Sequence, residues 1–171
     1  MNDGAIENDL NDSGISKAWR EKIALLEHIG AGRQSVFKAM KTPEFKALKY
    51  GQRQKISFNF WAFLFGPFYY FAKKIWDKGC VIWGFAILWG LLLSLVEVAF
   101  GVNLPPVVSW IPTAAVCAQI ANADVYRFVR YGEKMWPGLP VFSRPFVPAV
   151  FLLGSFALLT GTILVLERMG S

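Results

Sequence analysis

Long apolar runs dominate the second half of the sequence, whereas its first third alternates apolar and polar residues. Two runs, 80–100 and 146–166, have 21 residues each. A helix of about 20 residues spans the roughly 30 Å hydrocarbon core of a bilayer. The second run has no ionisable residue, and the first has only Glu97, near its end. Both runs are therefore predicted to be transmembrane helices.

A less apolar stretch covers residues 105–123. It contains Pro112, Gln119 and Asn122, which interrupt its apolar character. We still predict a span here, because the chain has to return across the membrane between the two stronger spans.

The first third of the chain shows the apolar spacing of an amphipathic helix. Within residues 16–29, the side chains of Trp19, Ile23 and Leu26 fall on one helix face. Gly30 is expected to end this helix.

Two shorter helices are predicted after it, over 33–41 and 41–51. Thr42 is placed as the N-cap of the later one, with Pro43 as its first residue and Gly51 at its end. The apolar side of the earlier one comprises Val36, Phe37 and Met40.

Charge is distributed unevenly. Residues 1–15 hold four acidic and no basic residues, whereas residues 16–78 hold thirteen Lys and Arg against four acids. Residues 1–15 lack the basic start and the apolar run of a cleavable signal peptide, so none is expected. We expect this acidic and polar stretch to be a disordered tail. The basic helical region, 16–55, fits either an anionic membrane surface on the cytoplasmic side or an ordinary solvated surface.

An unusual aromatic segment, ISFNFWAFLFGPFYYFAKKIW, covers residues 56–76 and carries ten aromatic rings. Phe58 to Gly66 is nine residues, or about 14 Å of helix, roughly half the hydrocarbon core. Gly66 and Pro67 then permit a sharp turn. We predict a re-entrant hairpin over 57–76, with a short, tilted span as the alternative.

Lysine and arginine favour the cytoplasmic side of a membrane protein. If the aromatic hairpin does not cross, seventeen basic residues lie inside and one lies outside. If it crosses, Lys73, Lys74 and Lys78 move outside, as do the four basic residues of 124–145. The count favours a multi-pass protein of the bacterial inner membrane with a cytoplasmic N-terminus.

The stretch 57–79 resembles the signature of a bacterial membrane-protein family catalogued as a domain of unknown function. The likeness is specific over these 23 residues, loose from the basic helices to about residue 130, and poor over 131–171. It implies a small inner-membrane protein with a few spans, and it implies no catalytic residue. Lys73 stands where the family usually has Arg. The matching positions are Phe58, Asn59, Ala62, Phe63, Phe65, Gly66, Pro67 and Lys74.

No pattern of a catalytic or metal site is found in the sequence. His28 is the single histidine, and Cys80 and Cys117 lie in apolar runs, where buried thiols are expected. We therefore expect no metal, no cofactor and no nucleic-acid partner.

Polar and small residues within the spans are the candidates for interaction. Gln119, Asn122 and Tyr126 share a helix face, and Asp124 can pair with Arg127 three residues on. In the last span, small residues recur at relative positions 0, 3 and 7. Small residues on one helix face let helices approach closely. The candidate set is Asn59, Gly66, Pro67, Lys73, Lys74, Glu97, Gln119, Asn122, Gly154, Ala157 and Gly161.

These patterns predict an all-α integral membrane protein with a basic cytoplasmic region, an aromatic hairpin and three transmembrane helices. The expected function is non-enzymatic: an interaction protein, in one form an immunity protein that neutralises a membrane-inserting bacterial toxin. Besides the lipid bilayer, its partner is a membrane protein, a toxin or a second copy. The alternative is a transporter or channel subunit that uses Glu97, Gln119 and Asn122. An enzyme is the third choice.

Overall fold

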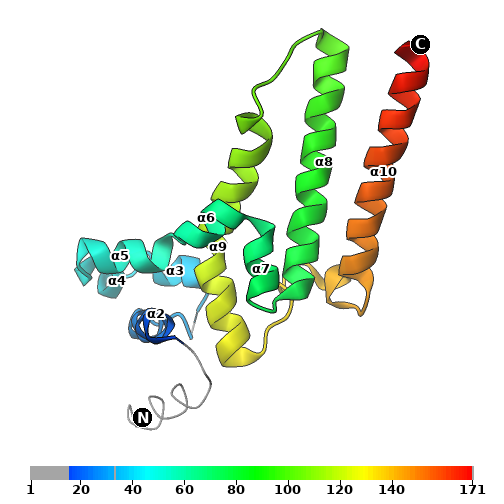
Figure 1. Ribbon diagram of the computed structural model, residues 1–171. Helices are drawn as coiled ribbons and strands as arrows, with labels where there is room; N and C mark the ends of the chain where they lie inside the picture. The colour runs from blue at the N-terminus through cyan, green and yellow to red at the C-terminus, as the bar shows by residue number, and fades with distance from the viewer. Residues whose placement is uncertain (1–15, 33, 171) are drawn as a thin grey trace. The chain divides into compact units, whose positions relative to one another are not determined.

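A computed structural model describes residues 16–32 and 34–170, with side chains described up to residue 168. Every regular element in this described part is a helix (Figure 1), which confirms the predicted all-α class. The chain divides into two compact units, one ending at Phe58 and the other beginning at Asn59. The tail expected over 1–15 lies outside the described residues, as does Arg33 of the expected second helix.

The first unit begins with helix α2 (Lys17–His28). It ends at the predicted place, because Gly30 adopts a left-handed conformation with φ 78°. The N–H of Ala31 then donates to the carbonyl of Leu26 at 2.9 Å, which closes a Schellman turn. The buried residues of α2 are those that the apolar spacing predicts: Trp19, Ile23 and Leu26.

The short helices that follow agree with the prediction at their start and differ later. Thr42 Oγ1 accepts a hydrogen bond from the N–H of Phe45 at 3.4 Å, and Pro43 opens the helix. Gly51 was expected at a helix end but lies inside the next helix, because the chain already leaves the helical conformation at Leu48 (ψ 148°). The three helices are α3 (Val36–Ala39), α4 (Pro43–Ala47) and α5 (Tyr50–Ser57).

The expected apolar side of the second helix is also only partly correct. Helix α3 has four residues, of which Val36 and Ala39 are buried. Phe37 was expected to face inward but is 50% exposed. A single helical turn can direct only one narrow side toward its neighbours, and Val36 and Ala39 occupy that side.

The aromatic segment forms two short helices, α6 (Phe60–Phe65) and α7 (Pro67–Ala72). Gly66 joins them with φ 52° and ψ −129°, a conformation that a residue with a Cβ atom rarely adopts. Pro67 is the first residue of α7, where its missing N–H costs nothing. The segment therefore consists of two short helices joined by a sharp turn and is not one continuous helix.

A tight turn connects α7 to the next helix. Lys74 has a left-handed backbone with φ 61°, and its N–H donates to the carbonyl of Phe71 at 3.0 Å. The N–H of Ile75 donates to the carbonyl of Tyr70 at 2.9 Å. Together these bonds form a Schellman turn, in which Gly usually holds the place of Lys74.

Three long helices follow, and their directions alternate along the chain (Figure 1). Two of them are long and apolar enough to cross a membrane, over Trp76–Phe100 and Val147–Arg168. The helix between them has 25 residues but does not meet the same test. The three helices are α8 (Trp76–Phe100), α9 (Val107–Tyr131) and α10 (Val147–Gly170), and a 3-10 turn, η1 (Pro140–Ser143), precedes α10.

Helix α10 packs along α8, and Gly84 lies at a close contact between them. A Cβ atom built on Gly84 would lie 2.5 Å from the ring of Phe151 and 3.3 Å from Ser155 Oγ. A larger residue at this position would push the helices apart. The small residues expected to serve close packing in the last span lie elsewhere on α10.

Candidate functional site

Asn59 holds the start of the aromatic hairpin against α9. Its Oδ1 accepts the N–H of Ala62 at 3.1 Å, which caps α6. Its Nδ2 donates to Tyr69 Oη at 3.0 Å and to Asn122 Oδ1 at 2.9 Å. Its own N–H donates to the carbonyl of Ala118 at 2.8 Å. One buried side chain thus ties α6, α7 and α9 together.

A second polar cluster centres on Lys78, in the first turns of α8. Its side chain is 0% exposed, and its Nζ contacts Asp124 Oδ1 at 2.8 Å and Glu133 Oε1 at 3.0 Å. Buried charges persist only when they are paired and hydrogen-bonded. Lys78 meets this condition with one acid on α9 and one just beyond it.

Both acids, Asp124 and Glu133, form further polar contacts with other members of the cluster. Asp124 accepts further hydrogen bonds from Tyr70 Oη at 2.9 Å and from Trp136 Nε1 at 2.7 Å. Arg127 pairs with Glu133 Oε2 at 3.0 Å. In the structure Arg127 thus pairs with Glu133, whereas Asp124, its expected partner, is taken by Lys78. We call Tyr70, Lys78, Asp124, Arg127, Glu133 and Trp136 the polar cluster.

Sequence reasoning did not single out Lys78, Tyr70 or Trp136. Lys78 and Asp124 are 46 residues apart, so no local spacing reveals the pair. One signal was present: Lys78 stands just before one apolar run and Asp124 just after another. Consecutive antiparallel helices bring such positions to the same end of a bundle.

The polar residues expected to line a solute path do not share one surface. Glu97 lies at the end of α8 and accepts the N–H of Leu104 through its side chain. Asn122 is fifteen residues beyond the start of α9, about 22 Å along the helix. It is buried against Asn59, whereas Gln119 is exposed.

The small residues expected to mediate helix contacts are exposed on α10. Gly154, Ala157 and Gly161 make up what we call the small-residue face. A Cβ atom built on Gly154 or Gly161 would meet nothing within 4 Å. The contact with α8 uses Phe151 and Ser155 instead, so the small-residue face is not part of the internal packing.

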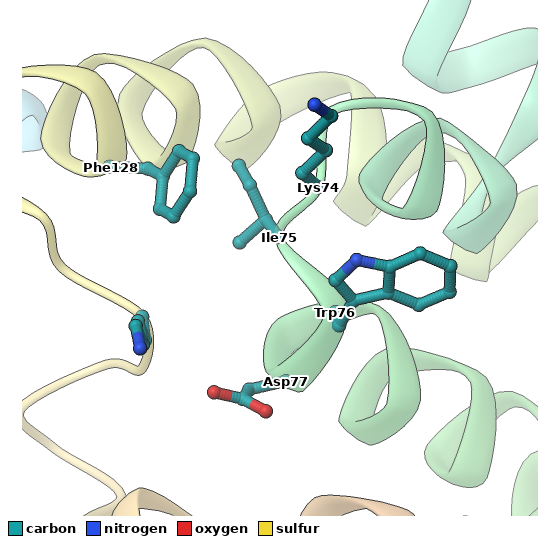
Figure 2. Close-up of a pocket in the computed structure, with 6 residues that line it drawn as sticks. Lys74, Ile75, Trp76, Asp77 and Phe128 are labelled. Carbon is teal, nitrogen blue, oxygen red and sulfur yellow. The ribbon is translucent and has the colours of Figure 1, made fainter.

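Two expected lysines lie at the end of the hairpin. Lys73 Nζ lies 5.8 Å from the centroid of the Tyr69 ring. Lys74 lines a pocket together with residues from the start of α8 and from around the end of α9 (Figure 2). Within the described residues, no group of three His, Cys, Asp or Glu side chains could hold a metal ion.

Comparison with known proteins identifies relatives over most of the chain. Residues 12–130 match the family described as Protein of unknown function (DUF2628). The chain belongs to this family. Bacterial relatives from Escherichia and Salmonella carry the name Uncharacterized protein YigF. The one from Escherichia coli (strain K12) is 31% identical over 131 residues, covering 74% of this chain and 94% of that protein.

The second relative is from Salmonella typhimurium (strain LT2), 32% identical over 96 residues, covering 56% of this chain and 72% of that protein. No solved structure matches the chain. The family match includes the hairpin and the polar cluster up to residue 130, and α10 lies wholly outside it. The match thus covers the residues of the hairpin and nearly all of α9, whereas it gives no information on α10.

Proposed function

We propose that the protein is a multi-pass integral protein of the bacterial inner membrane that acts without catalysis, by binding another membrane-embedded helix. Helix α10 carries this proposal. It is apolar enough over Val147–Arg168 to cross a membrane, and almost none of its most apolar stretch is buried within the molecule. A helix that is apolar all round and unburied is suited to lipid or to a partner helix.

The two sides of α10 differ in how they are used. Phe151 and Ser155 contact α8 at Gly84. On the other side, a Cβ atom built on Gly154 or Gly161 would meet nothing within 4 Å, and Ala157 is exposed. In a bilayer, helices associate through close backbone approach at small residues. The small-residue face therefore suits a partner helix better than a bulky face would.

The aromatic hairpin supports the membrane location. Several of its large side chains are exposed although they are apolar, and contiguous exposed apolar surface marks a membrane or an interaction site. Its two helices have six residues each, about 9 Å apiece, so each is too short to span. We propose that the hairpin enters the bilayer from the cytoplasmic side and returns. The exposed rings are Phe58, Phe60, Trp61, Phe65 and Phe68.

Helix α9 completes the proposed topology as a third span. Its 25 residues measure about 37 Å, enough to cross the hydrocarbon core. Its less apolar side faces the hairpin through Asn122 and faces Lys78 through Asp124. Burial of these polar groups within the protein makes the span acceptable in lipid.

Transport is the weaker candidate because its expected residues are dispersed. Glu97 and Asn122 lie at different depths along α8 and α9, and each has its own hydrogen-bond partner within the chain. A solute path needs polar groups on a continuous surface. A helix-binding function needs only the small-residue face.

The immunity form of the function gives the most direct test. The chain is co-expressed with the product of the adjacent gene, and growth and membrane potential are followed. We expect Gly161→Leu to abolish protection, because the bulky side chain separates the helices. Glu97→Gln serves as the control and should retain protection.

Thermal stability should be unchanged in Gly161→Leu, since nothing lies within 4 Å of the new Cβ. Protection that survives Gly161→Leu would refute binding through this face. An adjacent gene product that is harmless to unprotected cells would refute the immunity form.

A further inference from the structure

A pocket of about 240 Å³ lies where α7 meets α8, beside the end of α9. In Figure 2 the side chains of Ile75 and Phe128 point toward one another, and Lys74, Trp76 and Asp77 lie around them. The sixth lining residue is Lys134, three residues beyond the end of α9. All six residues belong to the second unit.

The pocket has an apolar interior and a charged rim. Ile75 is buried and Phe128 is half-buried, whereas Lys74 and Lys134 are exposed. Among the described residues, neither lysine forms an ion pair. Asp77 is the only acid among the described residues that line the pocket, so the charges of the rim sum to +1. This arrangement suits a ligand with a negative head and an apolar body.

The backbone at Lys74 shows that a lysine here has a cost. Its φ of 61° is left-handed, and Gly is the usual residue at this position of a Schellman turn. A non-glycine residue in this conformation stores strain. The chain nevertheless places a charged side chain at this point of the pocket rim.

The position of the pocket indicates what the ligand is. It lies at the first turn of α8 and just past the last turn of α9, which the proposed topology puts at the cytoplasmic headgroup layer. Trp76 is 60% exposed there, as expected of an aromatic anchor at a membrane interface. Basic pockets between transmembrane helices on this side of a membrane bind phospholipid headgroups.

We infer that this pocket binds the phosphate of an anionic phospholipid headgroup. Lys74 and Lys134 neutralise the phosphate, and the first acyl carbons lie against Ile75 and Phe128. Asp77 favours the N-terminus of α8 through the helix dipole and weakens the site for an anion. The inference rests on the proposed membrane location but not on a partner of α10.

The test uses the full chain purified in a neutral maltoside detergent. Dioctanoyl phosphatidylglycerol is titrated, and bound lipid is counted by native mass spectrometry. We expect Lys74→Gly and Lys134→Gln each to weaken binding about fivefold, the usual value of one lysine beside an anionic surface. Asp77→Asn should strengthen binding, because it removes the like charge.

Lys74→Gly separates binding from folding. Gly adopts the left-handed conformation without strain, so the melting temperature should not fall although lipid binding weakens. Lys46→Gln is the matched control: this lysine is exposed in α4 and does not line the pocket. Equal weakening by Lys46→Gln would mean general charge attraction and would overturn the site.

Two further arms identify the source of the phosphate. Dioctanoyl phosphatidylcholine should bind more weakly than phosphatidylglycerol, and inorganic phosphate at millimolar concentration should not displace the lipid. Displacement by inorganic phosphate would assign the pocket to a soluble anion and overturn the lipid assignment. If the protein partitions into membranes but Lys74→Gly and Lys134→Gln bind normally, this inference fails while the proposed function stands.

Discussion

At the scale of single residues, Lys78 connects elements through buried ion pairs. It is fully buried and joins α8 to Asp124 on α9 and to Glu133 beyond it. Removing one member of a buried ion pair leaves the other charge without compensation. Without this ammonium Asp124 keeps only the neutral donors Tyr70 and Trp136, whereas Glu133 keeps its pair with Arg127. The cost therefore falls mainly on the buried carboxylate of Asp124.

Lys78→Met is therefore expected to lower the free energy of unfolding by about 3–5 kcal/mol. Lys134→Met is the control, because this lysine is exposed and forms no ion pair among the described residues. Denaturant titration of both variants in the same detergent measures the difference. Equal stabilities would show that the ion pair contributes little.

Residue-level prediction from the sequence succeeded where the chemistry is local. Thr42 as a cap, Pro43 as a first helical residue and Gly66 as a turn each depend on neighbours within a few positions. The Lys78–Asp124 pair depends on 46 intervening residues. Asp124 was instead matched to Arg127, its nearest opposite charge in the sequence.

At the scale of elements, the aromatic hairpin is held by backbone geometry at its turn and by side chains at its base. Gly66 makes the turn, while Asn59 attaches α6 to α9 and Tyr70 attaches α7 to Asp124. Two of the positions that carry the family resemblance, Asn59 and Gly66, are among those that build this element.

The turn can be tested separately from packing. No described atom lies within 4 Å of a Cβ added at Gly66, so Gly66→Ala changes only backbone strain. We expect a loss of about 1–3 kcal/mol, typical of a residue held in a disfavoured region. Gly90→Ala is the matched control, since Gly90 also has no atom within 4 Å but lies inside α8. Thermal melting that ranks the two variants equally would contradict the strained turn.

Helix α9 shows why element boundaries were harder to predict. A span was expected over 105–123, but the helix continues to Tyr131. Asp124 and Arg127 resemble the polar end of a span when seen in sequence. In the structure Asp124 pairs with Lys78, and Arg127 pairs with Glu133. Because both charges are compensated, the helix can continue past them for two further turns.

At the scale of the whole molecule, the alternating directions of α8, α9 and α10 would set the charge balance between the two sides of the membrane in the proposed topology. The start of α8, the end of α9 and the start of α10 share one side, and the base-free α8–α9 loop lies on the other (Figure 1). This arrangement agrees with the positive-inside rule only if the hairpin does not cross.

Three single cysteines decide this topology, introduced at Lys46, Asn103 and Lys134 after Cys80 and Cys117 are replaced by Ala. All three positions are exposed. On intact spheroplasts, a membrane-impermeant maleimide should label position 103 alone, and permeabilisation should expose 46 and 134 together. A re-entrant hairpin keeps 46 and 134 on one side, because an even number of crossings separates them. Labelling of only one of these two in intact spheroplasts would instead establish that the hairpin spans the membrane, and it would also remove the basis for placing the lipid pocket at the cytoplasmic surface.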